Sequence, residues 1–291
     1  MLRLVIPKGS LERATMELLE AADLTVRRSS DVNYRGVIDD PRISQVRILR
    51  PQEIPRYVAA GLFDLGITGR DWIEETGSAV VSLGELSYSK NTSQPIRIVL
   101  AVAEDSPVQS VTDLPSGVRV STEYPELTRQ FFHRHGIEPE IQVSYGATEA
   151  KVPEIADAVV DLTETGGALR AAGLRIVGTL LVSGTELIAH EASAADPTKR
   201  EAMGQLLTLL QGALEARSKV LVKLNVAAAD LGAIIRLLPS MKSPTVSQLF
   251  GEEGYAVEAV VQKGQINTLI PALKDAGASD ILELSLSKIV H

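Results

Sequence analysis

The chain has 291 residues, 45% of them hydrophobic, with a formal net charge of -8 and no cysteine. This length is enough for two domains with buried cores. The negative charge argues against nucleic acid as the main partner, because nucleic-acid binding depends on Lys and Arg neutralising phosphates. Without cysteine, disulfides and thiolate chemistry are excluded. The four histidines show no metal-ligand spacing.

Two further exclusions concern the cell compartment. No apolar run reaches the length needed to span a membrane. The first residues pass from Met1 directly into a strand-like run, without the charged and apolar regions of a secretory signal. We therefore expect a cytoplasmic protein with no membrane partner.

The first part of the chain alternates strands and helices. An apolar strand is predicted over 2–6 and a helix from Ser10 onward, since apolar residues there recur at helical spacing. Strands over 46–49 and 63–67 follow, separated by a helix. Asp71, with Glu74 three residues later, predicts a helix capping box. This alternation is typical of parallel sheets covered by helices.

The same pattern repeats after a polar stretch over 87–94 that suits a crossing between lobes. The predicted elements are strands over 96–103, 118–120, 141–143 and 158–162, a helix around 127–133 and a long amphipathic helix over 197–217. If the chain crosses back near 175–190, it forms one lobe from 1–94 with 175–217 and a second from 95–174. We expect a cleft between the two α/β lobes.

The pattern changes after Ser218. Strands are predicted over 220–226, 245–250, 255–261 and 281–289, with helices over 229–238 and 266–276. This β-α-β-β-α-β order is that of a ferredoxin-like domain over 218–291. Small domains of this kind on enzymes often bind amino-acid effectors, although a fold alone does not establish a function.

The strongest local signal for chemistry is the stretch ADAVVDLTETGGAL at 156–169. An apolar strand ends at Asp161, and a Thr- and Gly-rich loop leads into a helix near Gly167. Such a loop presents backbone N–H groups where a phosphate is favoured, and Thr163 and Thr165 add hydroxyl donors. Asp161 and Glu164 would repel a phosphate unless they face ribose hydroxyls or Mg²⁺. An ordinary strand-to-helix turn is the alternative.

Two weaker signals lie where other strands end, the position at which open α/β sheets bind ligands. Lys8 follows the first strand and is a candidate to hold a pyrophosphate oxygen. The second signal is the glycine-flanked run from Gly66 to Asp71, which offers both donors and a carboxylate. A surface turn with Ser10 as helix cap, and a tight turn capped by Asp71, remain the alternatives.

Together these segments resemble the ATP phosphoribosyltransferases. The resemblance rests on IPKGSL at 6–11, LRPQEIPRYVAAGLFDLGITGRDW at 49–72, the 156–169 stretch with GL at 173–174, and LLPSMKSPTVSQL at 237–249. It implies a two-lobed core like the type II periplasmic binding proteins and the regulatory domain of the long form. It also implies Mg²⁺, a dimeric or hexameric homo-oligomer, and inhibition by histidine.

The resemblance also implies roles for individual residues. Phosphoribosyl pyrophosphate would be bound by Asp161, Leu162, Thr163, Glu164, Thr165, Gly166, Gly167 and Ala168. ATP and pyrophosphate would be bound by Lys8, Arg13, Arg50, Thr68, Gly69 and Asp71. The catalytic residues would be Lys8, Glu149 and Asp161, and the histidine effector would meet Asn225, Ser243 and Thr245. No protein ligand to the metal is assigned.

The sequence departs from the family pattern at three places, of which one is the irregular stretch ATEAKVPEI at 147–155 before ADA. Ser10 stands where the family usually has Arg, for which Arg13 is a candidate replacement, and Ala168 lacks the usual hydroxyl. These changes leave a catalytically silent histidine-sensing subunit as an alternative. A prephenate dehydratase would show a Thr-Arg-Asp motif that is missing here. A solute-binding protein would carry an export signal and would not need residues 218–291.

Overall fold

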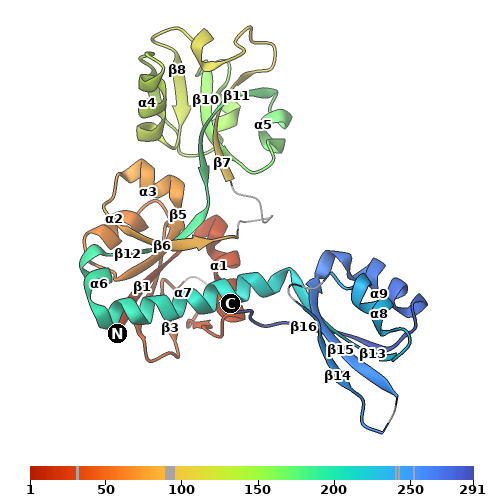
Figure 1. Ribbon diagram of the computed structural model, residues 1–291. Helices are drawn as coiled ribbons and strands as arrows, with labels where there is room; N and C mark the ends of the chain where they lie inside the picture. Colours follow the sequence, from red (N-terminus) through yellow and green to blue (C-terminus); the bar gives the residue numbers. More distant parts are fainter. Residues whose placement is uncertain (31–32, 89–95, 240, 242, 252) are drawn as a thin grey trace. The chain divides into compact units, whose positions relative to one another are not determined.

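The structure is a computed structural model, and it describes residues 1–30, 33–88, 96–239, 241, 243–251 and 253–291 (Figure 1). The chain forms two compact units. The first contains residues 1–20 and 24–207, and the second contains residues 21–23 and 208–291. The polar stretch predicted as a lobe crossing over 87–94 lies largely outside the described residues.

A seven-stranded sheet forms one part of the first unit, with strand order β2-β3-β4-β1-β5-β12-β6. At its centre β1 pairs in parallel with β4 and β5, while β12 is antiparallel to β5. The bounds are β2 Val26–Arg27, β3 Arg35–Ile38, β4 Ile43–Leu49, β1 Leu2–Pro7, β5 Leu65–Gly69, β12 Thr185–Ala189 and β6 Val81–Leu86. The predicted strands over 2–6 and 63–67 are thus confirmed within two residues at each end.

Each central strand leads into a helix. The helices are η1 Gly9–Leu11 with α1 Glu12–Ala21 after β1, α2 Ile54–Ala59 after β4, and α3 Arg70–Thr76 after β5. The predicted capping box at Asp71 is wrong. The helix already begins at Arg70 with Gly69 as its cap, and Glu74 pairs with the Arg70 guanidinium. Asp71 therefore lies inside the first turn, where its side chain is free to make other contacts.

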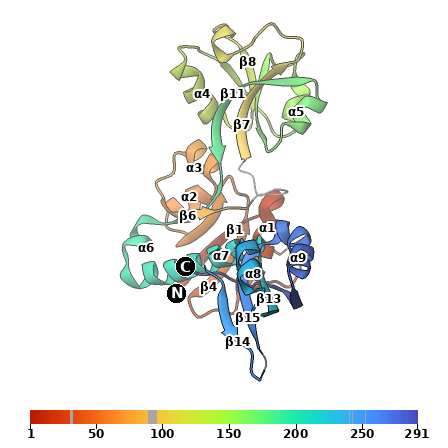
Figure 2. The same ribbon diagram turned by 45° about the vertical axis from the view of Figure 1, so that its right-hand side comes forward.

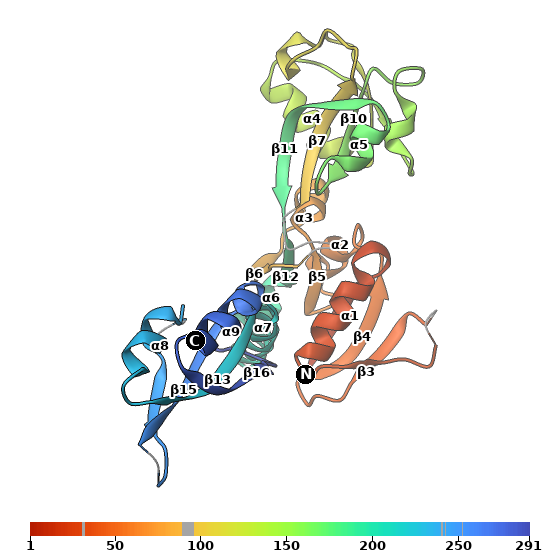
Figure 3. The same ribbon diagram turned by 90° about the vertical axis from the view of Figure 1, so that its right-hand side faces the viewer.

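A five-stranded sheet forms the other part of the first unit, with order β11-β7-β10-β8-β9. Its strands are β11 Leu174–Ser183, β7 Ile96–Ala103, β10 Ala158–Thr163, β8 Arg119–Thr122 and β9 Glu140–Val143. The associated helices are η2 Val111–Asp113, α4 Pro125–Arg134, η3 Thr148–Lys151 and α5 Gly167–Ala171. β11 runs antiparallel beside β7 (Figure 3). Residues 174–183 therefore belong to this sheet, and the return to the other sheet comes with β12.

Helices α6 Glu191–Ala195 and α7 Pro197–Arg217 follow β12. α7 is the long amphipathic helix that the sequence predicts, with Leu206, Leu210 and Ala213 buried on one face. Its first part belongs to the first unit and its last part to the second. Among the described residues no helix has the length and apolar character required to cross a membrane.

The second unit contains a four-stranded sheet with order β14-β15-β13-β16. Figure 2 shows β13, β14 and β15 of this unit together with α8 and α9. Its elements are β13 Lys219–Ala227, α8 Leu231–Leu237, β14 Thr245–Gln248, β15 Gly254–Gln262, η4 Lys263–Gln265, α9 Ile266–Asp275 and β16 Ala278–Ser285. This is the predicted ferredoxin-like order, and one sheet face packs against α8 and α9 around Val222, Leu224 and Val257. The last strand ends before its predicted position, because Ile289 instead donates its amide to Gly212 of α7.

Candidate functional site

Three of the predicted ligand-binding residues gather at one edge of the seven-stranded sheet. Lys8, Arg50 and Gly69 stand at or directly after the ends of β1, β4 and β5, which are parallel neighbours. The Lys8 amide donates to Leu49 O at 2.7 Å, which joins the first two of these turns. The carboxyl ends of parallel strands are where such sheets bind ligands.

The Lys8 side chain has a partner that sequence reasoning missed. Its ammonium nitrogen lies 4.4 Å from the ring centroid of Tyr34, a cation–π contact. Tyr34 precedes β3 and is 54% exposed. Arg13, the candidate replacement for the usual Arg at position 10, instead points along α1 and pairs with Glu17 at 3.9 Å.

The segment 161–169, called the 161–169 loop below, has the predicted strand-loop-helix form, but β10 continues past Asp161 to Thr163 and only 164–166 connect it to α5. Gly166 has a φ of +76°, a conformation that favours glycine, and its amide donates to the buried Thr163 hydroxyl at 2.7 Å. A Cβ at Gly166 would lie 2.8 Å from the Arg170 guanidinium. Thr163 thus shapes the turn from inside, whereas Thr165, Gly167 and Ala168 are exposed on its outer side.

Asp161 lies in the last part of β10, in an environment that is unfavourable for its charge. Burial, with smaller contributions from the nearby Glu149 and Glu123 carboxylates, raises the pKa of Asp161 to about 6. Its Oδ1 accepts the Leu162 amide at 2.7 Å. Bound hydroxyl groups or a cation would stabilise the ionised carboxylate here. The predicted catalytic residue Glu149 is thus near enough to Asp161 for its charge to raise the pKa of that carboxyl.

A cavity of about 380 Å³ adjoins the loop. Its lining includes four of the predicted site residues, namely Gly69, Asp71, Leu162 and Glu164. Ser10 and Leu11 also line it, together with the aromatic rings of Trp72 and Tyr88. The cavity therefore receives walls from both sheets of the first unit.

A second cavity, of about 540 Å³, is lined by Arg50. Its other walls come from Gln52, Glu53, Trp72, Glu123, Val143, Ser144 and Tyr145. The Gln52 side-chain oxygen is buried and accepts no hydrogen bond within the described part of the chain. Tyr145 is 96% exposed. Lys8 and Arg13 line neither of these two cavities.

Thr68 and Asp71, two of the predicted site residues, are buried and hydrogen-bonded within the protein. Thr68 is buried and donates its hydroxyl to Pro51 O at 3.0 Å. The Asp71 carboxylate accepts the hydroxyls of Ser183 at 2.7 Å and Tyr124 at 2.9 Å. Sequence reasoning missed Tyr124 and Ser183 because they lie 53 and 112 residues from Asp71 along the chain. Trp72 lies within the 49–72 segment but was assigned no role.

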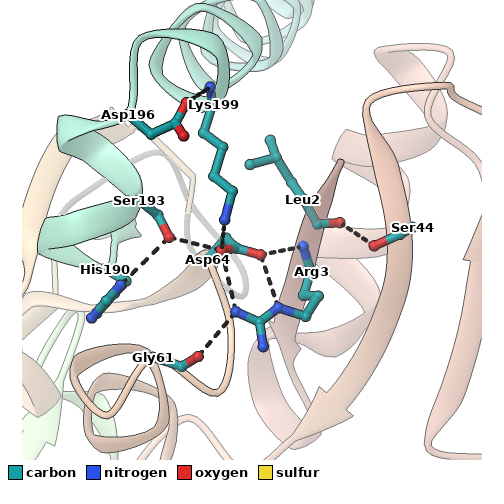
Figure 4. A network of polar contacts seen from close by, with 9 residues as sticks. All are labelled: Leu2, Arg3, Ser44, Gly61, Asp64, His190, Ser193, Asp196 and Lys199. Atoms are coloured by element: carbon teal, nitrogen blue, oxygen red, sulfur yellow. Dashed lines mark hydrogen bonds and ion pairs between the residues drawn. The ribbon is translucent and has the colours of Figure 1, made fainter.

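Another polar network lies at the opposite edge of the same sheet. Asp64, directly before β5, accepts hydrogen bonds from Arg3, Lys199 and Ser193 (Figure 4). Burial opposes its ionisation, but these donors outweigh burial and hold the pKa of Asp64 well below its usual range. Because this edge carries the beginnings of the parallel strands, we interpret the network as structural.

The predicted effector residues lie in the second unit, on or next to its sheet. Asn225 of β13 pairs with Ala256, and Thr245 of β14 pairs with Glu258, so both occupy the face opposite α8 and α9. Asn225 donates its side-chain amide to Asp280 at 3.0 Å. Ser243 is exposed in the segment before β14.

Mg²⁺ was expected from the family resemblance. Within the described ranges of the chain, no group of three His, Cys, Asp or Glu side chains lies close enough together to hold a metal ion.

Comparisons with known proteins identify the family of the chain. The family model described as HisG, ATP phosphoribosyltransferase, matches residues 50–212, and the model of the HisG C-terminal domain matches residues 216–288. The chain is 47% identical to the ATP phosphoribosyltransferase of Pelotomaculum thermopropionicum and 46% identical to that of Desulforudis audaxviator. Each alignment covers 99% of this chain and 99% of the relative.

A solved structure supports the same conclusion. It is a chain of the ATP phosphoribosyl transferase (HisG:HisZ) complex from Thermotoga maritima, with a TM-score of 0.63 and 26% identity. The match covers 74% of this chain and 99% of that chain. The chain belongs to the ATP phosphoribosyltransferase family, in both its core and its C-terminal domain.

Proposed function

We propose that this protein transfers the 5-phosphoribosyl group of phosphoribosyl pyrophosphate to N1 of ATP and releases pyrophosphate, the first step of histidine biosynthesis. The observation that carries the proposal is the 161–169 loop beside a cavity with walls from both sheets. The exposed side of the loop, with Thr165, Gly167 and Ala168, would hold the 5-phosphate through backbone N–H groups. Family membership supplies the identity of the two substrates.

Asp161 and Glu149 would face the ribose. Two neighbouring carboxylates repel a phosphate but accept hydrogen bonds from ribose hydroxyls, and their charge stabilises the oxocarbenium character that develops at C1. As the C1–oxygen bond to pyrophosphate breaks, the bond from C1 to adenine N1 forms. Adenine N1 carries a free electron pair, so the protein need not remove a proton to activate it.

The cationic sheet edge would receive the leaving group. Lys8 and Arg50 follow two adjacent parallel strands, and Gly69 allows the backbone of a third to approach closely. We assign these residues to pyrophosphate and to the ATP phosphates, where positive charge favours departure of the leaving group. Arg13 and Thr68 are weaker members of the proposed set, because Arg13 pairs with Glu17 and Thr68 is buried.

Mg²⁺ is the proposed metal, held mainly by substrate phosphates. Mg²⁺ usually binds through one or two carboxylates together with phosphate oxygens, and the described residues offer such a pair in Asp161 and Glu149 rather than a complete cage. Its charge would neutralise the pyrophosphate. The raised pKa of Asp161 fits a carboxylate that gains from a nearby cation.

Regulation is assigned to the second unit. We propose that histidine binds on the sheet face that carries Asn225 and Thr245 and inhibits the enzyme from there. This unit has its own core and lacks a loop comparable to that at 161–169 within its described residues. A homo-oligomer, dimer or hexamer, belongs to the same proposal, since inhibition requires that histidine favour one arrangement of the assembly.

The experiment that tests the function is direct. The protein is incubated with ATP, phosphoribosyl pyrophosphate and Mg²⁺, and pyrophosphate release is followed together with formation of the nucleotide product. We expect release only when both substrates and the metal are present. If the protein binds histidine but releases no pyrophosphate, it is the silent sensing subunit that Ser10 and Ala168 left open.

A further inference from the structure

Helix α3 makes a polar and aromatic contact with the first turn of α4. Tyr124, which directly precedes α4, donates its hydroxyl to Asp71 Oδ2 at 2.9 Å. Its ring stacks on Trp72, with ring centroids 4.6 Å apart and an interplanar angle of 29°. One turn further along α3, the Glu75 carboxylate accepts the amides of Glu126 at 3.0 Å and Leu127 at 2.9 Å. These amides belong to the first turn of α4, where a helix lacks internal partners.

The Asp71 carboxylate also contacts the chain where it leaves the five-stranded sheet. Ser183, the last residue of β11, donates its hydroxyl to Asp71 Oδ1 at 2.7 Å and accepts the Asp71 amide at 2.9 Å. Asp71 and Ser183 are each 1% exposed and Tyr124 is 2% exposed. A Cβ at Gly69 would lie 2.1 Å from Asp71 Oδ1. The glycine before the helix therefore leaves the space in which this carboxylate lies.

Asp71, Trp72 and Glu75 of α3 therefore bind three separate points of the five-stranded part, the residue before α4, the first turn of α4 and the end of β11. We call these three residues the α3 dock. The cavity of about 380 Å³ lies beside the dock, with Gly69 on one wall and Leu162 and Glu164 on another. The distance between these walls sets how a substrate that meets both is held.

We propose that the α3 dock positions the 161–169 loop against the sheet edge of Lys8 and Gly69, and that Asp71 acts through Tyr124 and Ser183 rather than by touching substrate. Orientation of two reacting groups is worth several orders of magnitude in rate, and it is lost when their supports shift by about 1 Å. Asp71 is thus a positioning residue. The kinetic consequence rests on the proposed function, whereas the contact itself does not.

The kinetic test removes the Tyr124 hydroxyl, which makes one hydrogen bond to Asp71, and separately the Ser183 hydroxyl, which makes two. Tyr124→Phe deletes the hydroxyl and keeps the ring on Trp72, and Ser183→Ala deletes the other donor. We expect each variant to raise the KM for phosphoribosyl pyrophosphate by about 5- to 10-fold and to lower kcat. Both constants are measured at a temperature well below the melting temperature of the variant. Tyr57→Phe is the matched control, because it removes an exposed hydroxyl bond to Glu53 outside the dock. Its KM should equal that of the parent.

A double-variant cycle separates positioning from direct contact. If Asp71 acts through Tyr124, then Asp71→Asn combined with Tyr124→Phe costs less than the sum of the two single effects. Additive effects, with Asp71→Asn alone removing substrate binding, would show that Asp71 contacts substrate and would overturn the proposal. Unchanged KM and kcat in both Tyr124→Phe and Ser183→Ala would overturn it as well, since a merely structural contact would move only the melting temperature.

A second readout does not depend on activity. Trp72 is the single tryptophan of the chain, so its fluorescence reports the dock directly. We expect Tyr124→Leu to change the emission wavelength and the quenching of Trp72 by iodide, whereas Tyr124→Phe keeps both. If the parent releases no pyrophosphate, the proposed function fails while this measurement still tests the dock. If the emission wavelength and iodide quenching of Trp72 are the same in Tyr124→Leu as in the parent, the contact is absent in solution.

Discussion

Asp161 shows how a single side chain acquires its properties from its surroundings. Its position after an apolar strand indicates a site residue, but the raised pKa arises from burial and from the Glu149 and Glu123 carboxylates, which come from other segments. A folded-state pKa of about 6 lies above the unfolded value of roughly 3.9. The stability associated with the protonated form is therefore complete below the unfolded pKa and is lost as the pH rises through 6.

This gives a prediction for pH. The kcat/KM of the parent should fall as the pH is lowered through about 6, because protonation removes the charge that faces the ribose. Asp161→Asn should lose this inflection and remain slow at every pH, yet be more stable by about 1–2 kcal/mol at pH 8. Asp157→Asn is the control, and it should lower rather than raise the stability at pH 8, since a hydrogen bond from Arg119 lowers the pKa of that carboxyl. Activity and denaturant unfolding across pH 4–9 measure both effects.

At the scale of an element, the 161–169 loop depends on Gly166. Gly166→Ala places a Cβ on a residue with positive φ and displaces the Arg170 guanidinium, so we expect the KM for phosphoribosyl pyrophosphate to rise about 10-fold or more. Gly173→Ala carries the same backbone strain, with a φ of +71°, but its Cβ would meet nothing within 4 Å. It should lower the melting temperature by a similar amount and leave the KM unchanged. Equal KM values in the two variants would remove the loop from the site.

The Asp64 network joins helix α7 and strand β1, and its prediction concerns stability. Asp64→Asn leaves Arg3 and Lys199 without their buried partner and should cost about 3 kcal/mol of unfolding free energy at pH 7. Because the folded pKa is depressed, this contribution is present above the unfolded pKa of roughly 3.9 and is lost as the pH falls below it. Asp39→Asn, which breaks the exposed pair with Arg27, should cost under about 1 kcal/mol. Urea unfolding at pH 7 and pH 3 compares the two variants.

At the scale of the whole molecule, chemistry and regulation are predicted to reside in different units. Calorimetry on the intact protein should show histidine binding, and Asn225→Ala and Thr245→Ala should abolish that binding and leave the uninhibited rate unchanged. The coupling between the units is expected to be about 1–3 kcal/mol. Asn267→Ala, an exposed asparagine of α9, is the matched control and should bind as the parent does. A parent that binds no histidine would contradict the regulatory assignment.

The sequence by itself determined which segments become strands and helices, the ferredoxin-like order of the last 70 or so residues, and the family, because these depend on local periodicity and on motifs that are contiguous along the chain. It did not predict the short strands β2 and β3, where few residues carry the pattern. It also predicted Asp71 as a helix cap from its neighbours alone, whereas the cap is Gly69.

The tertiary structure decided which side chains meet. Asp71 contacts Ser183 at a separation of 112 residues and Tyr124 at a separation of 53, and Lys199 reaches Asp64 across 135 residues. Local periodicity does not predict these pairs. The pairs of Ser183 and Lys199 form when β12 returns the chain to the first sheet, and the pair of Tyr124 forms when α3 packs against α4. The charge state of Asp161 has the same origin. Burial and the neighbouring carboxylates are properties of the folded chain, and they decide whether a residue binds substrate or holds the structure that does.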